Sequence, residues 1–115
     1  MTTSTIPDVG PARDKALAEK LGLEYLPTVG IHLSLSTPAP RTIGHVSTDP
    51  IAAFRLVQHL VERGYRVKLE HEPDAPAGME WEATIGKTLQ HPMCAADPAD
   101  AITQAIYRDW EHRGK

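Results

Sequence analysis

Two short His-x-Ser triplets are the residues whose types and spacing could carry out a reaction. The first is His32-Leu33-Ser34, and the second is His45-Val46-Ser47, thirteen positions further along the chain. An imidazole accepts or donates a proton near neutral pH, and a serine hydroxyl can hold a phosphate oxygen. Two such triplets facing each other could therefore cleave a phosphate ester. The interpretation that we favour is structural, with His32 and Ser34 on the polar face of a strand and Ser47 leading into a helix.

The pair of triplets resembles the signature of the 2H phosphoesterases, in which two histidines act as general acid and base while the hydroxyls hold the phosphate. The resemblance implies catalytic roles for His32 and His45. That family places its triplets on separate lobes of a larger chain, whereas here thirteen residues separate them. The phosphoesterase is therefore the last of three functional hypotheses, and we favour a protein without enzymatic activity.

No other motif indicates a metal, a cofactor or a nucleophile. The six histidines never stand at the H-x-H or H-x-x-x-H spacing of a ligand pair, so we predict no metal site and no cofactor. The single Cys94 excludes an intramolecular disulfide, and we expect it to pack as a small hydrophobic side chain. A nucleophilic pair of Cys94 with His91 stays open, although nothing in the spacing selects it.

Length and charge narrow the class of protein. A chain of 115 residues predicts a single domain, and we assign residues 11–115 to it and residues 1–10 to a frayed terminus. Twelve Lys and Arg against fifteen Asp and Glu give a net charge of −3 with no basic stripe, which argues against nucleic acid as the partner. The chain has neither a signal-peptide pattern nor an apolar run of about 20 residues, so we expect a cytoplasmic protein with no membrane partner.

Prolines and alternating residues predict the elements that must position these side chains. Proline at the first helical position predicts three helices, over residues 11–21, 50–63 and 98–113. Alternation of apolar and polar residues predicts strands over residues 29–36, 65–72, 79–85 and 89–95. The order predicts an α+β fold with a small, mainly antiparallel sheet of three to four strands packed with two to three helices.

The same patterns predict how the elements pack. The second helix should bury a stripe made of Ala53, Phe54, Val57, Leu60 and Val61. Because the chain has only six aromatic residues, we expect four of them to meet in one core cluster: Phe54, Tyr65, Trp81 and Trp110. In the hairpin we expect Lys68 to lie near Glu82 across the two strands.

Several segments resemble the phage ABA sandwich domain family, a set of small proteins from bacteriophages and prophages. They are a Ser-Thr-Asp helix start, an opening helix, a hairpin tryptophan and an alanine-rich closing helix, here Ser47–Asp49, Ala16–Gly22, Trp81 and Ala101–Ile106. The resemblance implies an α/β/α-type sandwich and a location in the host cytoplasm. It implies no common activity.

Two binding functions rank above the phosphoesterase hypothesis. The preferred one is a phage or prophage accessory protein that binds a host or viral protein and inhibits a host defence system. Its partner would contact an acidic face made of Glu70, Glu72, Asp74, Glu80 and Glu82. The alternative is a protein that sequesters a small nucleotide-like ligand at the helix N-termini capped by Asp49 and Asp97. A second copy of the chain is a further candidate partner.

Overall fold

The computed structural model describes residues 6–33, 41–89 and 91–113. Within these ranges the elements are α1 (Pro11–Leu21), β1 (Glu24–Leu26), β2 (Gly30–Leu33), β3 (Arg41–Gly44), α2 (Pro50–Glu62), β4 (Arg66–His71), β5 (Trp81–Gly86), β6 (Met93–Ala95) and α3 (Pro98–Arg113). The three predicted helices are confirmed at their first residues. Ser34 to Ser36 of the first predicted strand lie outside the described residues.

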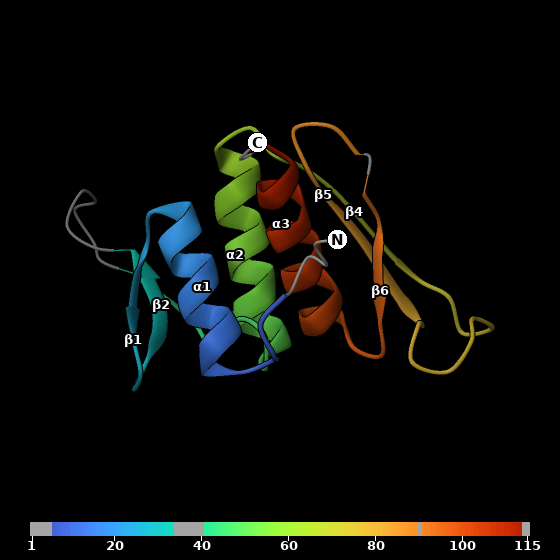
Figure 1. Cartoon of the computed structure of the whole chain (residues 1–115), viewed down its shortest axis with the longest axis horizontal. Helices are drawn as coiled ribbons and strands as arrows, with labels where there is room; N and C mark the ends of the chain where they lie inside the picture. Colours follow the sequence, from blue (N-terminus) through green and yellow to red (C-terminus); the bar gives the residue numbers. More distant parts are fainter. Residues whose placement is uncertain (1–5, 34–40, 90, 114–115) are drawn as a thin grey trace, which may run out of the picture.

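The strands form two antiparallel sheets of three strands each, in the orders β1-β2-β3 and β4-β5-β6. The helices stand between the two sheets (Figure 1), with α1 and α2 against the first sheet and α2 and α3 against the second. The predicted α+β class is confirmed. An α/β/α-type sandwich would have one sheet between helical layers, whereas here the helices are the middle layer.

The charge pattern of the second sheet explains this order of layers. On β4 the side chains alternate, with Val67 and Leu69 half-buried against the helical core and Arg66, Lys68 and Glu70 exposed. A sheet with one apolar and one charged face can bury only the apolar face. The second sheet therefore takes helices on one side and leaves its charged side to solvent.

Local signals at the helix ends act as predicted. The Asp49 carboxylate accepts a hydrogen bond from the backbone N–H of Ile51, and Asp97 Oδ1 accepts one from the N–H of Asp100. At the end of α1, Gly22 adopts the left-handed conformation at φ 72°, and the Leu23 N–H donates to the Ala18 carbonyl. These caps mark the starts of α2 and α3 and the end of α1.

The buried face of α2 differs from the predicted one. Ala52, Ala53, Leu56 and Leu60 are buried, whereas Phe54 is 45% and Val61 50% exposed. Alanines on the inner face let the α2 backbone approach β3 closely, since a side-chain carbon on Gly44 would lie 2.9 Å from Cβ of Ala52. The helix is therefore rotated so that its small residues, and not its ring, point inward.

The predicted aromatic cluster is also wrong. Phe54 is on the surface, Trp81 stacks with His71 at 4.6 Å between ring centroids, and Trp110 lies 6.4 Å from Tyr107. Fully buried aliphatic side chains build the core instead, among them Leu17, Ile31, Leu56, Leu60 and Ile102. The aromatic residues lie around this core.

The hairpin register is shifted from the predicted one. Lys68 pairs with Thr84, and Glu70 lies directly opposite Glu82. The backbone N–H of Glu72 donates to the Glu80 carbonyl, which sets the pairing at the base of the connecting loop. The prediction of Lys68 beside Glu82 is wrong by two residues, because the loop between the strands is two residues longer than that pairing requires.

Candidate functional site

Ser47 of the second triplet is hydrogen-bonded to the segment at the start of α1. It is 1% exposed, and its hydroxyl accepts a hydrogen bond from the Gly10 N–H at 2.8 Å and donates to the Gly10 carbonyl at 3.2 Å. Its own backbone N–H donates to Asp14 Oδ1 at 2.9 Å. The hydroxyl is thus engaged with backbone groups and attaches the entry to α1 to the loop before α2.

The two histidines of the triplets have different neighbours. His32 Nε2 lies 3.1 Å from Glu24 Oε1 on the adjacent strand β1, at angles that do not make a hydrogen bond. His45 Nδ1 lies 4.0 Å from Asp14 Oδ2, a buried carboxylate oxygen. Ser34 lies outside the described residues. The described contacts therefore place the two imidazoles in two separate acidic environments, and they do not join the triplets into one catalytic group.

A partly buried ion pair links the first and last helices. Arg13 Nη1 donates to Asp100 Oδ1 at 2.5 Å and to Thr103 Oγ1 at 3.1 Å, and Arg13 Nε donates to the Pro7 carbonyl at 2.8 Å. Thr103 is fully buried and donates in turn to the Ala99 carbonyl. These contacts satisfy a buried guanidinium and serve the packing of α1 on α3.

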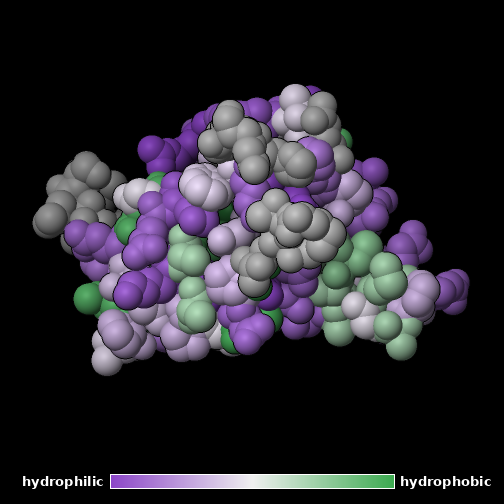
Figure 2. Space-filling model, viewed as in Figure 1, coloured by the Kyte–Doolittle hydropathy of each residue, from purple (hydrophilic) through white to green (hydrophobic). Residues whose placement is uncertain are grey.

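The predicted acidic residues do come together at one end of the β4–β5 hairpin. Glu70 and Glu82 are cross-strand neighbours, and Glu72 and Glu80 pair through their backbones at the base of the loop that contains Asp74. Like charges directly opposite each other destabilise a sheet, so this end of the hairpin favours a cationic neighbour. Figure 2 shows hydrophilic side chains over much of the visible face, with hydrophobic residues gathered towards this loop, where Met79 is 47% exposed.

Cys94 on β6 is a poor nucleophile. Burial raises the pKa of its thiol, and the negative charge of Glu82 and a hydrogen bond to that carboxylate raise the pKa further. Its Sγ lies 3.9 Å from Glu82 Oε2, in the cross-strand position. The thiol therefore stays protonated near neutral pH, which disfavours the pair with His91.

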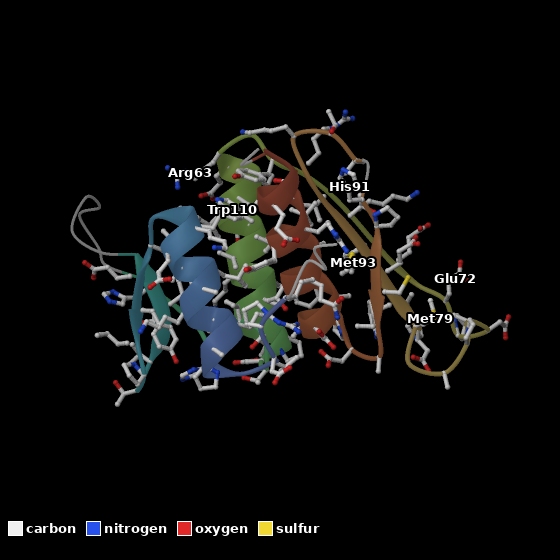
Figure 3. All side chains as sticks on the ribbon, in the orientation of Figure 1. Arg63, Glu72, Met79, His91, Met93 and Trp110 are labelled. Atoms are coloured by element: carbon white, nitrogen blue, oxygen red, sulfur yellow. The ribbon has the colours of Figure 1, made fainter. Side chains whose placement is uncertain are left out.

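A pocket in the described surface was missed by sequence reasoning. It is a pocket of about 500 Å³ at the end of the helical layer where α1, α2 and α3 all terminate, lined by Lys20, Leu21, Leu60, Arg63, Tyr65, Lys87 and Trp110. Figure 3 shows Arg63 and Trp110 at this end of the molecule. We call it the cationic pocket, because three of its seven lining residues are basic and none is acidic.

Two of the three cations lie over aromatic rings. Lys20 Nζ is 3.9 Å from the centroid of the Trp110 ring and 5.3 Å from that of Tyr107, and Lys87 Nζ is 4.5 Å from that of Tyr65. Lys87 Nζ also donates to the Arg63 carbonyl at 3.2 Å, just beyond the end of α2. Ring faces and helix-end carbonyls thus hold the ammonium groups at the rim of the pocket.

The sequence carries only a faint signal for this pocket. Lys20 is the last residue but one of α1, and Arg63 and Lys87 directly follow α2 and β5. Nothing in their spacing shows that these ends meet in space, and Trp110 matches the pattern of a buried helical stripe.

The comparisons with known proteins leave the family open: no protein family, no curated protein and no solved structure matches this chain. Among the described residues, no helix is long and apolar enough to cross a membrane. Within the same ranges, no three His, Cys, Asp or Glu side chains gather closely enough to hold a metal ion.

Proposed function

We propose that this protein is a non-enzymatic binding protein that takes a small, nucleotide-like anion in the cationic pocket. The observation that carries the proposal is the lining itself, which brings three basic side chains and two aromatic rings together with no carboxylate. This is the chemistry of a ligand that combines a phosphate or carboxylate with a planar ring. It moves the predicted ligand site from the helix N-termini, where Asp49 and Asp97 already accept the free N–H groups, to the opposite helix ends.

Arg63 is the side chain best suited to hold the anion. Lys20 and Lys87 both serve the fold, one over Trp110 and the other at the Arg63 carbonyl. Across the described part of the chain, no hydrogen bond is recorded from the exposed Arg63 guanidinium. Its planar group offers two parallel N–H donors to a phosphate or carboxylate, and the two ammonium groups add charge beside it.

The two rings provide the second half of the recognition. Trp110 and Tyr65 are half-buried and line the same pocket as the basic groups. A base or other planar group that enters beside Trp110 would share its surface with the Lys20 ammonium, and stacking contributes about 1–3 kcal/mol per ring. A ligand with both parts should therefore bind more tightly than inorganic phosphate or the nucleoside alone.

Titration of the indole fluorescence with ATP, AMP, adenosine and inorganic phosphate tests the proposal. A Trp81→Phe background leaves Trp110 as the reporting tryptophan. We expect the nucleotides to bind and Arg63→Ala to weaken them about tenfold or more, the value of one charge-assisted contact. Arg55→Ala, at an exposed arginine of α2 outside the pocket, is the matched control and should bind as the parent does. A flat titration for the whole panel, or equal affinity for Arg63→Ala and Arg55→Ala, would rule the pocket out.

A protein partner at the acidic end of the hairpin is the second candidate, favoured by the opposed pair of Glu70 and Glu82. The proposed partner is a host or viral protein with a basic surface, such as a nucleic-acid-binding host enzyme, because such a surface complements the acidic face. Inhibition of host defence and a phage origin go with this proposal. Alanine replacement of the whole acidic face (Glu70, Glu72, Asp74, Glu80 and Glu82) should abolish capture of such a partner from a host lysate. Unchanged capture would remove the acidic face from the proposal.

A further inference from the structure

We propose that the free edge of β4 pairs with β4 of a second copy of this chain, antiparallel and centred on Leu69. The inference goes beyond ligand binding, because the cationic pocket includes no residue of β4. It rests on three features of the strand: a free edge, the direction of its backbone groups and the order of its charges.

The edge is available in the described structure. β4 is the first strand of the order β4-β5-β6, and among the described residues it pairs with β5 alone. The Glu72 N–H donates to the Glu80 carbonyl, and the register continues without a bulge from His71 to Arg66. In an antiparallel ladder the backbone N–H and C=O groups of successive residues point alternately to one side of the strand and to the other. Because Glu72 bonds towards β5, the other even-numbered residues of the strand do so too. The backbone groups of Val67, Leu69 and His71 therefore point to the free edge.

This direction selects how a second strand could add. The outward-facing residues must form the hydrogen-bonded pairs, which places Leu69 opposite the partner's Leu69 and Val67 opposite the partner's His71. Lys68 then lies opposite the partner's Glu70. Arg66 lies opposite the partner's Glu72. Both charged pairs fall at non-hydrogen-bonded positions, where Cα atoms approach to about 4.5 Å and side chains are closest.

The order of charges makes this register self-complementary. Along the exposed face of the strand the residues are Arg66, Lys68, Glu70 and Glu72, so that the sign changes once, at Leu69. A shift of the two-fold centre by one residue would oppose Lys68 to itself or Glu70 to itself, and an in-register parallel arrangement would oppose every charge to its like. Of these arrangements, only the one centred on Leu69 contains no like-charge pair.

The single chain leaves charge that the second copy would neutralise. Glu70 faces Glu82 across the hairpin. It also forms an exposed ion pair with Lys68, whose Nζ lies 3.7 Å from Glu70 Oε1. Charged residues on an edge strand often serve only to prevent aggregation. An edge of one sign would repel every copy, whereas this edge attracts a second copy in the register centred on Leu69 and repels it in the other arrangements compared above.

One strand pair is a small interface, so the dimer should be weak and concentration-dependent. Sedimentation velocity from micromolar to about millimolar protein measures its dissociation constant. Lys68→Glu and Glu70→Lys should each raise that constant about tenfold or more, because two attractive cross-strand pairs become repulsive. Lys15→Glu, an exposed lysine on α1, is the matched control and should leave the constant unchanged.

Mixing the two single variants separates pairing between chains from effects within one chain. The Lys68→Glu chain carries two acidic groups at the interface and the Glu70→Lys chain two basic ones, so neither should self-associate, while the mixture should form a heterodimer. The double variant Lys68→Glu/Glu70→Lys should dimerise as the wild type does. Far-UV circular dichroism checks that each exposed-site variant is folded.

Three results would overturn the proposal. The first is a wild-type chain that remains monomeric throughout the concentration range. The second is a dimer that the single reversals do not weaken, and the third is a mixture of the two variants that stays monomeric. A monomer that binds a basic peptide at Glu70 and Glu72 would assign this edge to a foreign partner instead.

Discussion

Replacement of the buried Ser47 by alanine is the sharpest test of the structural role assigned to the second triplet. The hydroxyl bonds both backbone groups of Gly10, at 2.8 and 3.2 Å, inside a buried site. In the Ser47→Ala variant the Gly10 carbonyl keeps a donor, the N–H of Asp14 at 3.0 Å. The Gly10 N–H, in contrast, loses its acceptor, the Ser47 hydroxyl.

The size of the stability loss follows from one buried donor, the Gly10 N–H, which the variant leaves unpaired. An unsatisfied buried N–H costs about 1–3 kcal/mol, and deletion of a single oxygen adds little through the cavity. We therefore expect Ser47→Ala to lower the free energy of unfolding by about 2 kcal/mol. Thr48→Ala is the control, because its exposed hydroxyl lies 3.4 Å from the His45 carbonyl and should contribute less than about 0.5 kcal/mol.

Urea denaturation followed by circular dichroism measures the difference. With a slope of about 1–3 kcal/mol per molar urea, the midpoint of Ser47→Ala should fall by about 1 M while that of Thr48→Ala stays near the wild type. Equal midpoints for the two variants would refute the argument. A Ser47→Ala protein that kept its midpoint but lost a cyclic-phosphate hydrolysis shown by the wild type would restore the triplet as a catalytic element.

Two further perturbations test packing and titration. Gly30→Ala should destabilise the fold by about 4 kcal/mol or more, because Gly30 has φ 82° and a Cβ there would lie 2.3 Å from backbone atoms of the neighbouring strand. Gly22→Ala is the control and should cost only about 1–2 kcal/mol in thermal or urea unfolding, because Gly22 has φ 72° and nothing lies within 4 Å of a Cβ built there. Similar losses for both variants would contradict the close approach of β2 to β3. Alkylation of Cys94 at about pH 8 should be slower than that of a free thiol, and Glu82→Gln should speed it by lowering the pKa, whereas Glu80→Gln should not. Because the folded-state pKa of Cys94 is raised, the unfolded chain loses the thiol proton at lower pH than the folded chain does. The contribution of Cys94 to the free energy of unfolding is therefore fully present below about pH 8.5 and declines as the pH rises above that value. A rate unaffected by Glu82→Gln would show that burial alone raises the pKa.

Local signals predicted the helices better than they predicted the packing. Pro11, Pro50 and Pro98 mark the first residues of the three helices, because a proline at that position removes a donor that has no partner there. The alternation along residues 66–71 predicts Val67, Leu69 and His71 on the inner face of β4; Val67 and Leu69 do pack against the core, whereas His71 is exposed. The alternation could not reveal the shift that places Glu70 opposite Glu82, since register depends on the connecting loop and on the partner strand.

The candidate sites divide in the same way. The acidic residues of the hairpin were predictable as a group, because they belong to two neighbouring strands joined by one turn. The cationic pocket was not, because Lys20, Arg63 and Lys87 come from three distant segments that meet only when the helices pack between the sheets.

The sequence by itself determined where the helices begin, which face of β4 is charged and that one cysteine stands alone. These properties depend on a few consecutive residues and on composition. Only the tertiary structure decided that Phe54 faces outward, that the Ser47 hydroxyl is bonded to Gly10 and that three cations line one pocket. Each of these depends on the distance between segments far apart in the chain, and close packing of the buried side chains sets that distance.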